Sequence, residues 1–265
     1  MKEINHLKKN LLPFSTKFSV LAEKYDQTAY NCAELETVID NYSMFITNKE
    51  NKMKWEKLQP WELDEVSQLA EDLRRKSAVC VSLMEKYRAM KLLEGKGEMA
   101  AYFKNIESSI EREFGSFHIT PASKVLLVGA GSFPMTALLI ARETGAEVIG
   151  IDIDEEAVKL GQNVINAIGQ GLRISLEKTL AQNLEAIGDV THIIFSSTVA
   201  SKYDILDELY ERTNEHVVVA MRYGNQLKSL FNYPLKEVNE QKWELVEQVV
   251  RPKQIFDIAL YQKAI

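Results

Sequence analysis

An uncharged stretch, VLLVGAGSFPMTALLIA, covers residues 125–141 and constrains the fold more than any other feature of the chain. Its length falls just short of that of a helix that spans a membrane. Two glycines and a proline stand in its middle, however, and such residues mark a sharp turn between two short elements. The stretch is therefore predicted to form a buried strand, a glycine loop and a helix.

Glycine is rare before this stretch, since only three of the twelve glycines precede residue 119. Apolar residues recur there at helical spacing. The pattern predicts helices near residues 15–30, 35–46, 66–87 and 98–114. Pro60 is expected to begin the longest of them, which Gly95 and Gly97 would end. Residues 1–118 are therefore predicted to form an α-helical bundle.

Short β-rich runs alternate with helical stretches after residue 121. The runs lie at residues 124–128, 147–151, 173–176, 192–195 and 217–221, and the helical stretches between them at 136–144, 155–168 and 202–213. This alternation predicts an α/β fold with a parallel, doubly wound sheet. Two last β-rich runs, 243–250 and 255–262, are too close for a crossover helix and should pair as an antiparallel hairpin. Residues 119–265 thus resemble the Rossmann-like fold of class I methyltransferases that use S-adenosylmethionine (SAM).

Composition excludes several classes of function. The chain has 265 residues with 32 basic and 38 acidic side chains, so its net charge is −6 and nucleic acid is not an expected partner. Cys32 and Cys80 lie among apolar helical positions and are expected to be buried thiols in a reducing compartment. The first twenty residues lack the unbroken apolar core of a secretion signal. A cytoplasmic protein without a membrane partner is expected.

The loop after the first predicted strand, GAGSFP at residues 129–134, has the form of a nucleotide-binding turn. Its glycines let a ligand approach the backbone, and the next helix offers free N–H groups. Asp152 is expected to end the second strand, where a carboxylate can accept both hydroxyls of a ribose. Nucleoside binding is predicted; a tight turn without a ligand is the alternative. Pro134 replaces the third glycine of the dinucleotide motif, which favours SAM over NAD because SAM carries no pyrophosphate.

The residues expected to contact SAM lie in four segments that follow predicted strands: Gly129, Ala130, Gly131 and Pro134, then Asp152 and Ile153, then Thr179 and Leu180, then Ser196 and Ser197. Thr179 and Leu180 stand where adenine usually docks. The hydroxyls at 196–198 could instead cap the next helix. Asp154 is either another ligand contact or the N-cap of the helix at 155–168.

Several longer strings resemble the nicotianamine synthase family. They are GxGxxPMT at 129–136, VVVAMRxG at 217–224, FNYP at 231–234 and YFxN at 102–105. The strings IEREFG, THIIFSST and RPKQIFDIALY are closer still to its staphylopine-type branch, the opine-metallophore aminobutanoyltransferases. The resemblance covers most of the chain. It implies a helical bundle on a Rossmann-like methyltransferase domain, with SAM as the donor.

The reaction implied by this resemblance is transfer of the 3-amino-3-carboxypropyl (α-aminobutanoyl) group of SAM rather than of its methyl group. The implied acceptor is the amino nitrogen of histidine, D-histidine in first place, and methylthioadenosine (MTA) is released. An opine dehydrogenase using a 2-oxo acid would then complete a metallophore. All three carbons on the sulfonium are electrophilic, so the γ-carbon must be held in line with the amine.

The resemblance also implies two catalytic residues in the helical part. Tyr102 corresponds to a pocket tyrosine that orients the amine or accepts a proton, although its spacing also suits core packing. The histidine amine must be deprotonated before it attacks, and Glu85, a carboxylate bordering an apolar helix face, is the predicted base. Glu36, Glu107 and Glu111 are rival candidates.

Three residues are expected to bind the acceptor. Arg222 ends the fifth strand and has the fork geometry that a substrate carboxylate needs, with a surface ion pair as the alternative. Thr198 and Tyr233 would wall the pocket, although an aromatic residue before proline often serves only in packing. The four histidines show no spacing of metal ligands, so no protein metal site is predicted.

Two other functions compete with aminobutanoyl transfer. The first is an ordinary SAM-dependent methyltransferase for a small molecule. Against it, Leu127 stands where such enzymes usually carry an acidic residue that helps to hold the methionine part of SAM. The second is a module that senses SAM without catalysis. A homodimer is compatible with the sequence, which decides neither the oligomeric state nor the enantiomer of the acceptor.

Overall fold

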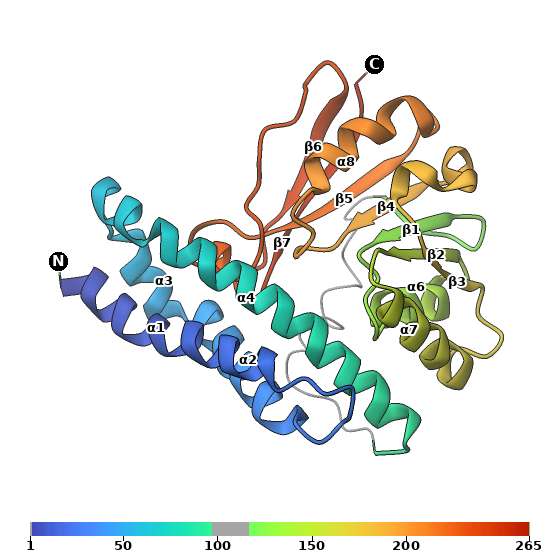
Figure 1. Ribbon diagram of the computed structural model, residues 1–265. Helices are drawn as coiled ribbons and strands as arrows, with labels where there is room; N and C mark the ends of the chain where they lie inside the picture. Colours follow the sequence, from blue (N-terminus) through green and yellow to red (C-terminus); the bar gives the residue numbers. More distant parts are fainter. Residues whose placement is uncertain (1, 97–116, 265) are drawn as a thin grey trace.

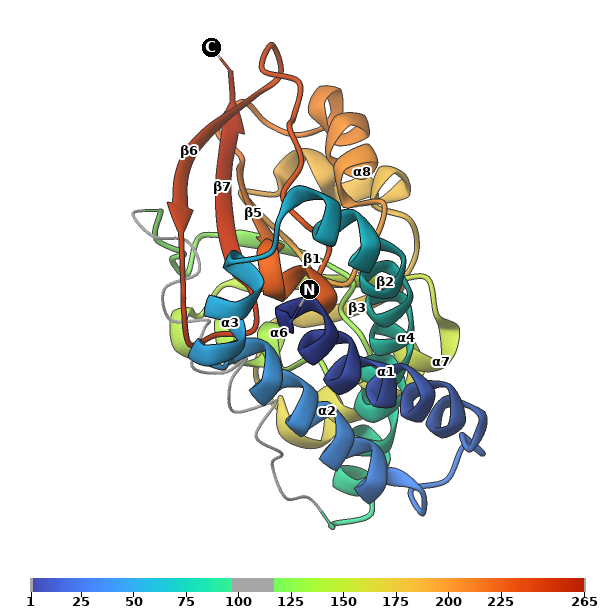
Figure 2. The same ribbon diagram turned by 90° about the vertical axis from the view of Figure 1, so that its left-hand side faces the viewer.

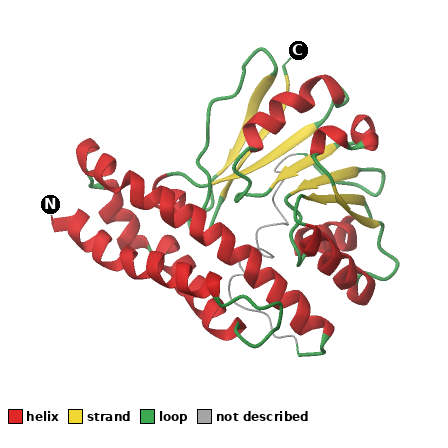
Figure 3. Cartoon of the chain, in the orientation of Figure 1, coloured by secondary structure: helices red, strands yellow, loops and turns green. Residues whose placement is uncertain are grey.

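A computed structural model describes residues 2–96 and 117–264 of the chain. Helices gather on one side of the molecule and a twisted sheet with its own flanking helices on the other (Figure 1; Figure 3). The helix predicted near 98–114, together with Tyr102, Glu107 and Glu111, lies outside the described residues. No helix within the described ranges is long and apolar enough to cross a membrane.

The helical part consists of α1 (Lys2–Glu23), α2 (Cys32–Thr47), α3 (Lys49–Glu56) and α4 (Pro60–Leu93). Pro60 begins α4 as predicted, because a proline in the first helical position lacks only an N–H that the helix does not use. Gln59 and Glu62 close this end with a capping box. Beyond the other end of α4, Gly95 adopts a φ of 74°, which is the left-handed conformation that favours glycine.

Helix α1 differs from the prediction near residues 15–30. It begins at Lys2, contains Pro13 in its interior and already ends at Glu23. An interior proline costs a helix about 3 kcal/mol. Five side chains on one face of α1 are at most 3% exposed, namely Ile4, Leu7, Leu11, Phe18 and Leu21. Their burial against the other helices offsets the cost of the proline, which helical periodicity alone does not show.

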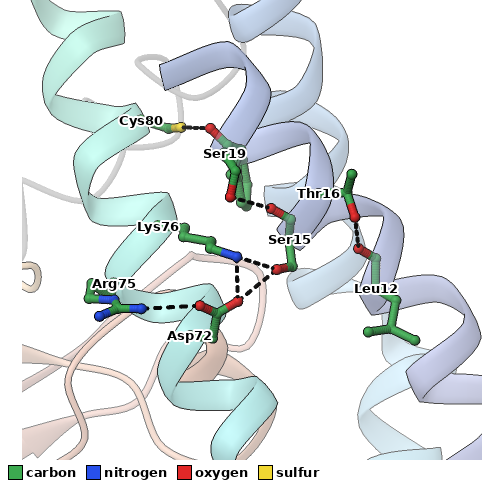
Figure 4. A network of polar contacts seen from close by, with 9 residues as sticks. Leu12, Ser15, Thr16, Ser19, Asp72, Arg75, Lys76 and Cys80 are labelled. Carbon is green, nitrogen blue, oxygen red and sulfur yellow. Dashed lines mark hydrogen bonds and ion pairs between the residues drawn. The ribbon is translucent and has the colours of Figure 1, made fainter. Parts of the chain in front are cut away.

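A polar network joins α1 to α4 inside the bundle (Figure 4). Ser15 Oγ donates to Asp72 Oδ2 at 2.6 Å and accepts from Lys76 Nζ at 2.8 Å. Lys76 also forms an ion pair with the same carboxylate oxygen at 2.8 Å. Nearby, Cys80 is a fully buried free thiol whose Sγ donates to the Phe18 carbonyl. These contacts fix the register of α1 along α4.

The sheet confirms the predicted fold class. Its strands are β1 (Lys124–Val128), β2 (Glu147–Asp152), β3 (Ile174–Lys178), β4 (His192–Phe195), β5 (Val218–Tyr223), β6 (Trp243–Val249) and β7 (Asp257–Lys263). Their order is β3-β2-β1-β4-β5-β7-β6, with β1 to β5 parallel and β7 antiparallel to β5 and β6. The β6–β7 hairpin occupies the edge opposite β3 (Figure 2).

Helices cover both faces of this sheet. Its flanking helices are α6 (Met135–Thr144), α7 (Glu155–Ile168) and α8 (Lys202–Leu209), which a 3-10 turn at Tyr210–Arg212 continues. Successive side chains of a strand point to opposite faces. Accordingly, Val125 and Leu127 pack into a core that continues into the bundle, whereas Leu126 and Val128 pack into a second core beside α8. The bundle and one face of the sheet therefore share a single hydrophobic core.

Polar contacts fasten the bundle to the sheet unit. The Tyr42 hydroxyl, on α2, donates to the Leu230 carbonyl at 2.8 Å, and Arg74 Nε, on α4, donates to the Ser229 carbonyl at 2.7 Å. Both carbonyls belong to a 3-10 helix, η4 (Gln226–Leu230), that follows β5. The aromatic ring of Tyr42 lies between those of Phe18 and Phe231, with centroids 5.0 and 5.4 Å away.

Replacing Tyr42 by phenylalanine should lower the free energy of unfolding by about 1–2 kcal/mol, because the buried Leu230 carbonyl loses its donor. The midpoint of urea denaturation, followed by circular dichroism, measures the effect. The matched control is Tyr30→Phe, since Tyr30 is 92% exposed and should tolerate the change. Equal midpoints for both variants would show that the Tyr42 hydroxyl does not stabilise the junction.

Candidate active site

The register of the sheet brings four strand ends to one edge. Val128 of β1 lies opposite Ile151 of β2 and Phe195 of β4, and Phe195 lies opposite Met221 of β5. The residues that follow these four emerge together at the carboxyl edge, where open parallel sheets bind ligands. They are Gly129, Asp152, Ser196 and Arg222, each of which the sequence analysis selected.

The glycine loop is held in a conformation that needs its glycines. Gly129 and Gly131 have φ values of 81° and 68°, which side chains rarely adopt. A Cβ at Gly129 would lie 2.7 Å from Val199 Cγ2, and one at Gly131 would collide with the carboxylate of Glu85. The Gly129 and Ala130 N–H groups both donate to the Ile151 carbonyl at 3.0 Å.

Asp152 supports the same loop. Its Oδ2 accepts from the Gly131 N–H at 2.9 Å and its Oδ1 from the Asp154 N–H at 3.1 Å. Each carboxylate oxygen can accept a further hydrogen bond, so both remain able to bind ribose hydroxyls. Asp154 serves as the N-cap of α7, because its Oδ1 accepts from Glu156 N at 2.9 Å and Ala157 N at 3.3 Å.

A cleft of about 430 Å³ opens at this edge between the sheet and α4. Most residues predicted to contact SAM line it: Gly129, Gly131, Asp152, Ile153, Thr179, Leu180 and Ser196. The opposite wall comes from α4 through Ala78, Val81, Ser82 and Glu85. Ile153 and Leu180 are 73% and 46% exposed, so apolar surface stands open at the rim of the cleft.

A smaller cavity of about 50 Å³ adjoins the cleft and contains the predicted acceptor-binding Arg222. Its walls include Leu127, Ala130, Phe133, Thr136, Ser197 and Phe256. Five residues line both spaces, namely Val81, Glu85, Gly129, Ser196 and Thr198. Glu85 is the only carboxylate among them. The carboxylate of Glu85 therefore stands where the two spaces meet.

The environment of Glu85 changes its ionisation. Burial, and next the negative charge of Asp152, raise the pKa of its carboxyl to about 8. A hydrogen bond from the Ser132 backbone and the charge of Arg222 act in the opposite direction. Of the rival candidates for the base, Glu36 is the one that lies within the described residues. It forms an ion pair with Lys91 at 3.1 Å and lines neither cavity. The geometry therefore favours Glu85 over Glu36.

Arg222 is not a surface residue, because it is only 5% exposed. Its Nη2 donates to Thr136 Oγ1 at 3.1 Å, and its guanidinium carbon lies 4.9 Å from the ring centroid of Phe256. The backbone carbonyl of Arg222 accepts a hydrogen bond of 2.5 Å from Lys202 Nζ. Strand β5 and its neighbours thus hold the guanidinium in place within the wall of the smaller cavity.

Lys202 is a buried cation that the sequence analysis missed. Its side chain is fully buried and also donates to the Tyr233 carbonyl at 3.4 Å. Burial, together with the charges of Arg74 and Lys236, lowers its pKa to about 7. Because Lys202 bonds to the Arg222 carbonyl within β5 and to the Tyr233 carbonyl after η4, it ties the two segments together. No local pattern distinguishes such a lysine from a solvated one.

The remaining predicted residues lie around the two cavities in different ways. Ser197 and Thr198 line the smaller one, and the N-cap position of α8 is occupied by Ser201, so residues 196–198 do not cap that helix. Pro134 precedes α6 as its N-cap residue and lines neither space. Tyr233 also lines neither; its ring instead lies 5.4 Å from the guanidinium carbon of Arg74.

The sequence contained a signal for the wall contributed by α4. Ala78, Val81, Ser82 and Glu85 follow the three- and four-residue spacing that places side chains on one helix face. Thr136 and Phe256, which contact Arg222, fall within the strings GxGxxPMT and RPKQIFDIALY. Only the folded chain shows that these segments meet.

Two proteins of known name are similar to this chain over most of its length. The chain is 29% identical to an L-histidine 2-aminobutanoyltransferase of Pseudomonas aeruginosa over 91% of its length and 90% of that protein. It is 33% identical to a protein of the same name from Yersinia pestis, over 70% of its length and 69% of that protein. No family model matches the chain.

Among solved structures, the fold is similar to that of MtNAS. The crystal structure of MtNAS in complex with MTA and tNA superimposes with a TM-score of 0.74 and 14% identity, covering 97% of this chain and 98% of that one. A mutant of MtNAS in complex with S-adenosylmethionine gives a TM-score of 0.72. This likeness extends over the helical part as well as the sheet, so the fold is shared as a whole.

Replacing Glu85 by glutamine should stabilise the protein increasingly as the pH rises from 5 to 8.5. The raised pKa means that the folded chain holds a proton that the unfolded chain releases, so wild-type stability falls between the ordinary glutamate pKa and about 8. Glutamine does not titrate and escapes this loss.

Melting temperatures at several pH values measure this effect, and the difference between the variant and the wild type isolates Glu85. Glu71→Gln, on the exposed side of the same helix, is the matched control and should show no such trend. A difference for Glu85→Gln that stays constant from pH 5 to 8.5 would contradict a raised pKa.

Proposed function

The chain belongs to the nicotianamine synthase-like family of histidine 2-aminobutanoyltransferases, and we propose that it transfers the α-aminobutanoyl group of SAM to the amino nitrogen of histidine. One observation carries the proposal at the level of the site: Glu85 lines both the cleft and the smaller cavity. A proton acceptor at the junction of two spaces is what a reaction between two bound molecules requires.

The larger cleft fits SAM. Asp152 offers carboxylate oxygens to the ribose hydroxyls, and the exposed Ile153 and Leu180 offer apolar surface to the adenine. The positive φ values of Gly129 and Gly131 let a ligand approach the backbone. SAM supplies an electrophilic carbon on a positively charged sulfonium. Asp152 gives the site the negative charge that a sulfonium needs, and a bound sulfonium in turn favours the ionised form of Glu85.

The transfer would then proceed by direct displacement. The histidine amine attacks the γ-carbon of the aminobutanoyl arm, a carbon–nitrogen bond forms, the carbon–sulfur bond breaks, and neutral MTA leaves. The amine proton passes to Glu85. A carboxyl pKa of about 8 suits this step, because a base works best when its pKa is close to that of its partner and to the working pH.

Positioning selects the γ-carbon over the methyl carbon. Arg222, held by Thr136 and Phe256, is proposed to bind the carboxylate of the acceptor through its fork of N–H groups. Ser197 and Thr198 would complete this side of the smaller cavity. Tyr102 lies outside the described residues, and its role in orienting the amine stays a prediction from the sequence.

The competing methyltransferase function is less well supported by the site. Leu127, 2% exposed, lines the smaller cavity at the position where methyltransferases usually carry an acidic residue for the methionine part of SAM. An apolar side chain there leaves the aminobutanoyl arm free to take another direction. The family relationship points the same way, because the relatives are named as aminobutanoyltransferases.

The wider setting of the reaction is proposed from the resemblance alone. The product would be joined to a 2-oxo acid by an opine dehydrogenase in the cytoplasm, giving an opine metallophore. Residues 1–118 would cover the site and residues 119–265 bind SAM. For the acceptor, the names of the relatives favour L-histidine over the D enantiomer.

Incubation of the protein with SAM and either enantiomer of histidine should release MTA in amounts equal to the aminobutanoyl-histidine formed. Liquid chromatography with mass spectrometry identifies both products, and omission of histidine is the control. S-adenosylhomocysteine together with methylhistidine would instead establish the methyltransferase function. SAM binding without turnover of any amine would support a sensing module.

Replacing Asp152 by alanine should weaken SAM binding on the order of 10- to 100-fold, because hydrogen bonds from ribose hydroxyls to a charged group are lost. Isothermal titration calorimetry measures the dissociation constant. Glu155→Gln is the matched control, since its side chain is 78% exposed and lines neither cavity. Equal losses in both variants would attribute the effect to the loop rather than to ribose contacts.

A further inference from the structure

Four lysine and arginine side chains are buried in the described part of the chain, namely Lys86, Arg88, Lys202 and Arg222. Three of them have partners within the protein. Lys86 forms ion pairs with Asp154 and Glu156 at 2.7 and 2.6 Å, Lys202 donates to two carbonyls, and Arg222 donates to Thr136. The fourth, Arg88, has no such partner among the described residues.

Arg88 is 4% exposed, yet its guanidinium has no hydrogen bond or ion pair with any described residue. Its Nε is buried without an acceptor. Within the described ranges the charge faces an aromatic ring, since the guanidinium carbon lies 5.7 Å from the ring centroid of Phe133. A buried charge without a counterion is costly, so such a group is retained where a bound anion completes it.

The position of Arg88 places this charge beside the active site. Arg88 follows Glu85 by three residues on α4, and residues at this spacing are neighbours on one helix face. Phe133 belongs to the glycine loop and, like Glu85, lines the smaller cavity. Arg88 itself lines neither space and reaches the wall of the smaller cavity through its contact with Phe133 on the helical side, whereas Arg222 lines that cavity from the sheet.

The proposed substrates carry two carboxylates, and Arg222 can bind one of them, so a second cation is needed for the other. The aminobutanoyl arm of SAM and histidine each carry an α-carboxylate, and both must enter a site that already contains Glu85 and Asp152. Arg222 can serve one of these carboxylates. Since a guanidinium is the side chain best matched to a carboxylate, a second arginine is expected for the other.

We propose that Arg88 binds the α-carboxylate of an amino-acid substrate, and that Arg88 and Arg222 divide the two carboxylates of the reaction between them. This inference rests on the proposed function. It explains why the fold keeps an arginine without a charged partner among the described residues next to the proposed catalytic carboxylate. It also assigns Arg88 to specificity, because an amine without a carboxylate would leave the guanidinium unpaired.

The test compares Arg88→Met, Arg88→Lys and the control Arg75→Met, whose side chain is 75% exposed on the same helix. Calorimetry gives the dissociation constants of SAM and of histidine without requiring turnover. Turnover assays give KM for histidine and for histamine, which lacks the carboxylate.

If Arg88 binds the acceptor, Arg88→Met raises KM for histidine on the order of 10- to 100-fold and leaves histamine unchanged. If it binds the donor, the dissociation constant of SAM rises by the same order and the preference for histidine over histamine persists. Arg88→Lys should fall between wild type and Arg88→Met, because it keeps the charge and loses the fork.

The melting temperature supplies an independent readout. Removal of an unpaired buried charge should leave it unchanged or raise it, so reduced binding without loss of stability supports a ligand site. Unchanged binding constants in Arg88→Met, or a lowered melting temperature in both Arg88 variants, would overturn the proposal. Absence of MTA with the wild-type protein would instead refute the proposed function, and the calorimetric comparison distinguishes the two failures.

Discussion

The packing of α4 across the carboxyl edge of the sheet is the contact on which the rest of the site depends. Two adjacent residues of this helix make it in different ways. The carboxylate of Glu85 lies against Gly131 of the glycine loop, and Lys86 forms ion pairs with Asp154 and Glu156 at the start of α7. The helix is thus fixed to the loops after β1 and β2 at once, and neither cavity would have its second wall without it.

This packing buries charged groups at the expense of stability, and the proposed reaction depends on the same groups. Glu85 is partly buried near Asp152, so its pKa rises, and Arg88 is buried without a counterion among the described residues. Both arrangements lower the stability of the free protein. In the proposed reaction, both would become favourable when a cationic sulfonium and substrate carboxylates enter. A site whose own charges are incomplete binds charged ligands more selectively than one already neutralised within the fold.

The sequence predicted the sheet well because buried parallel strands are short, apolar and bounded by loops, as β1 and β4 are to the residue. It was wrong about the start of α1, where burial of one helix face overrides Pro13. Gly129, Asp152, Ser196 and Arg222 could be found because they stand at the carboxyl ends of strands or directly after them. Lys202 and Arg88 could not, since only tertiary packing reveals which cations are buried and which have partners.

The central claim is that α4 delivers a carboxylate poised to accept a proton between two bound substrates. The ionisation of Glu85 in the free protein tests it most directly, by nuclear magnetic resonance titration of glutamate carboxyl carbons in protein labelled with ¹³C. One resonance should titrate with a midpoint at a pH of about 8 and be absent from Glu85→Gln. Titration of every glutamate carboxyl near the ordinary value of about 4.3 would contradict the claim.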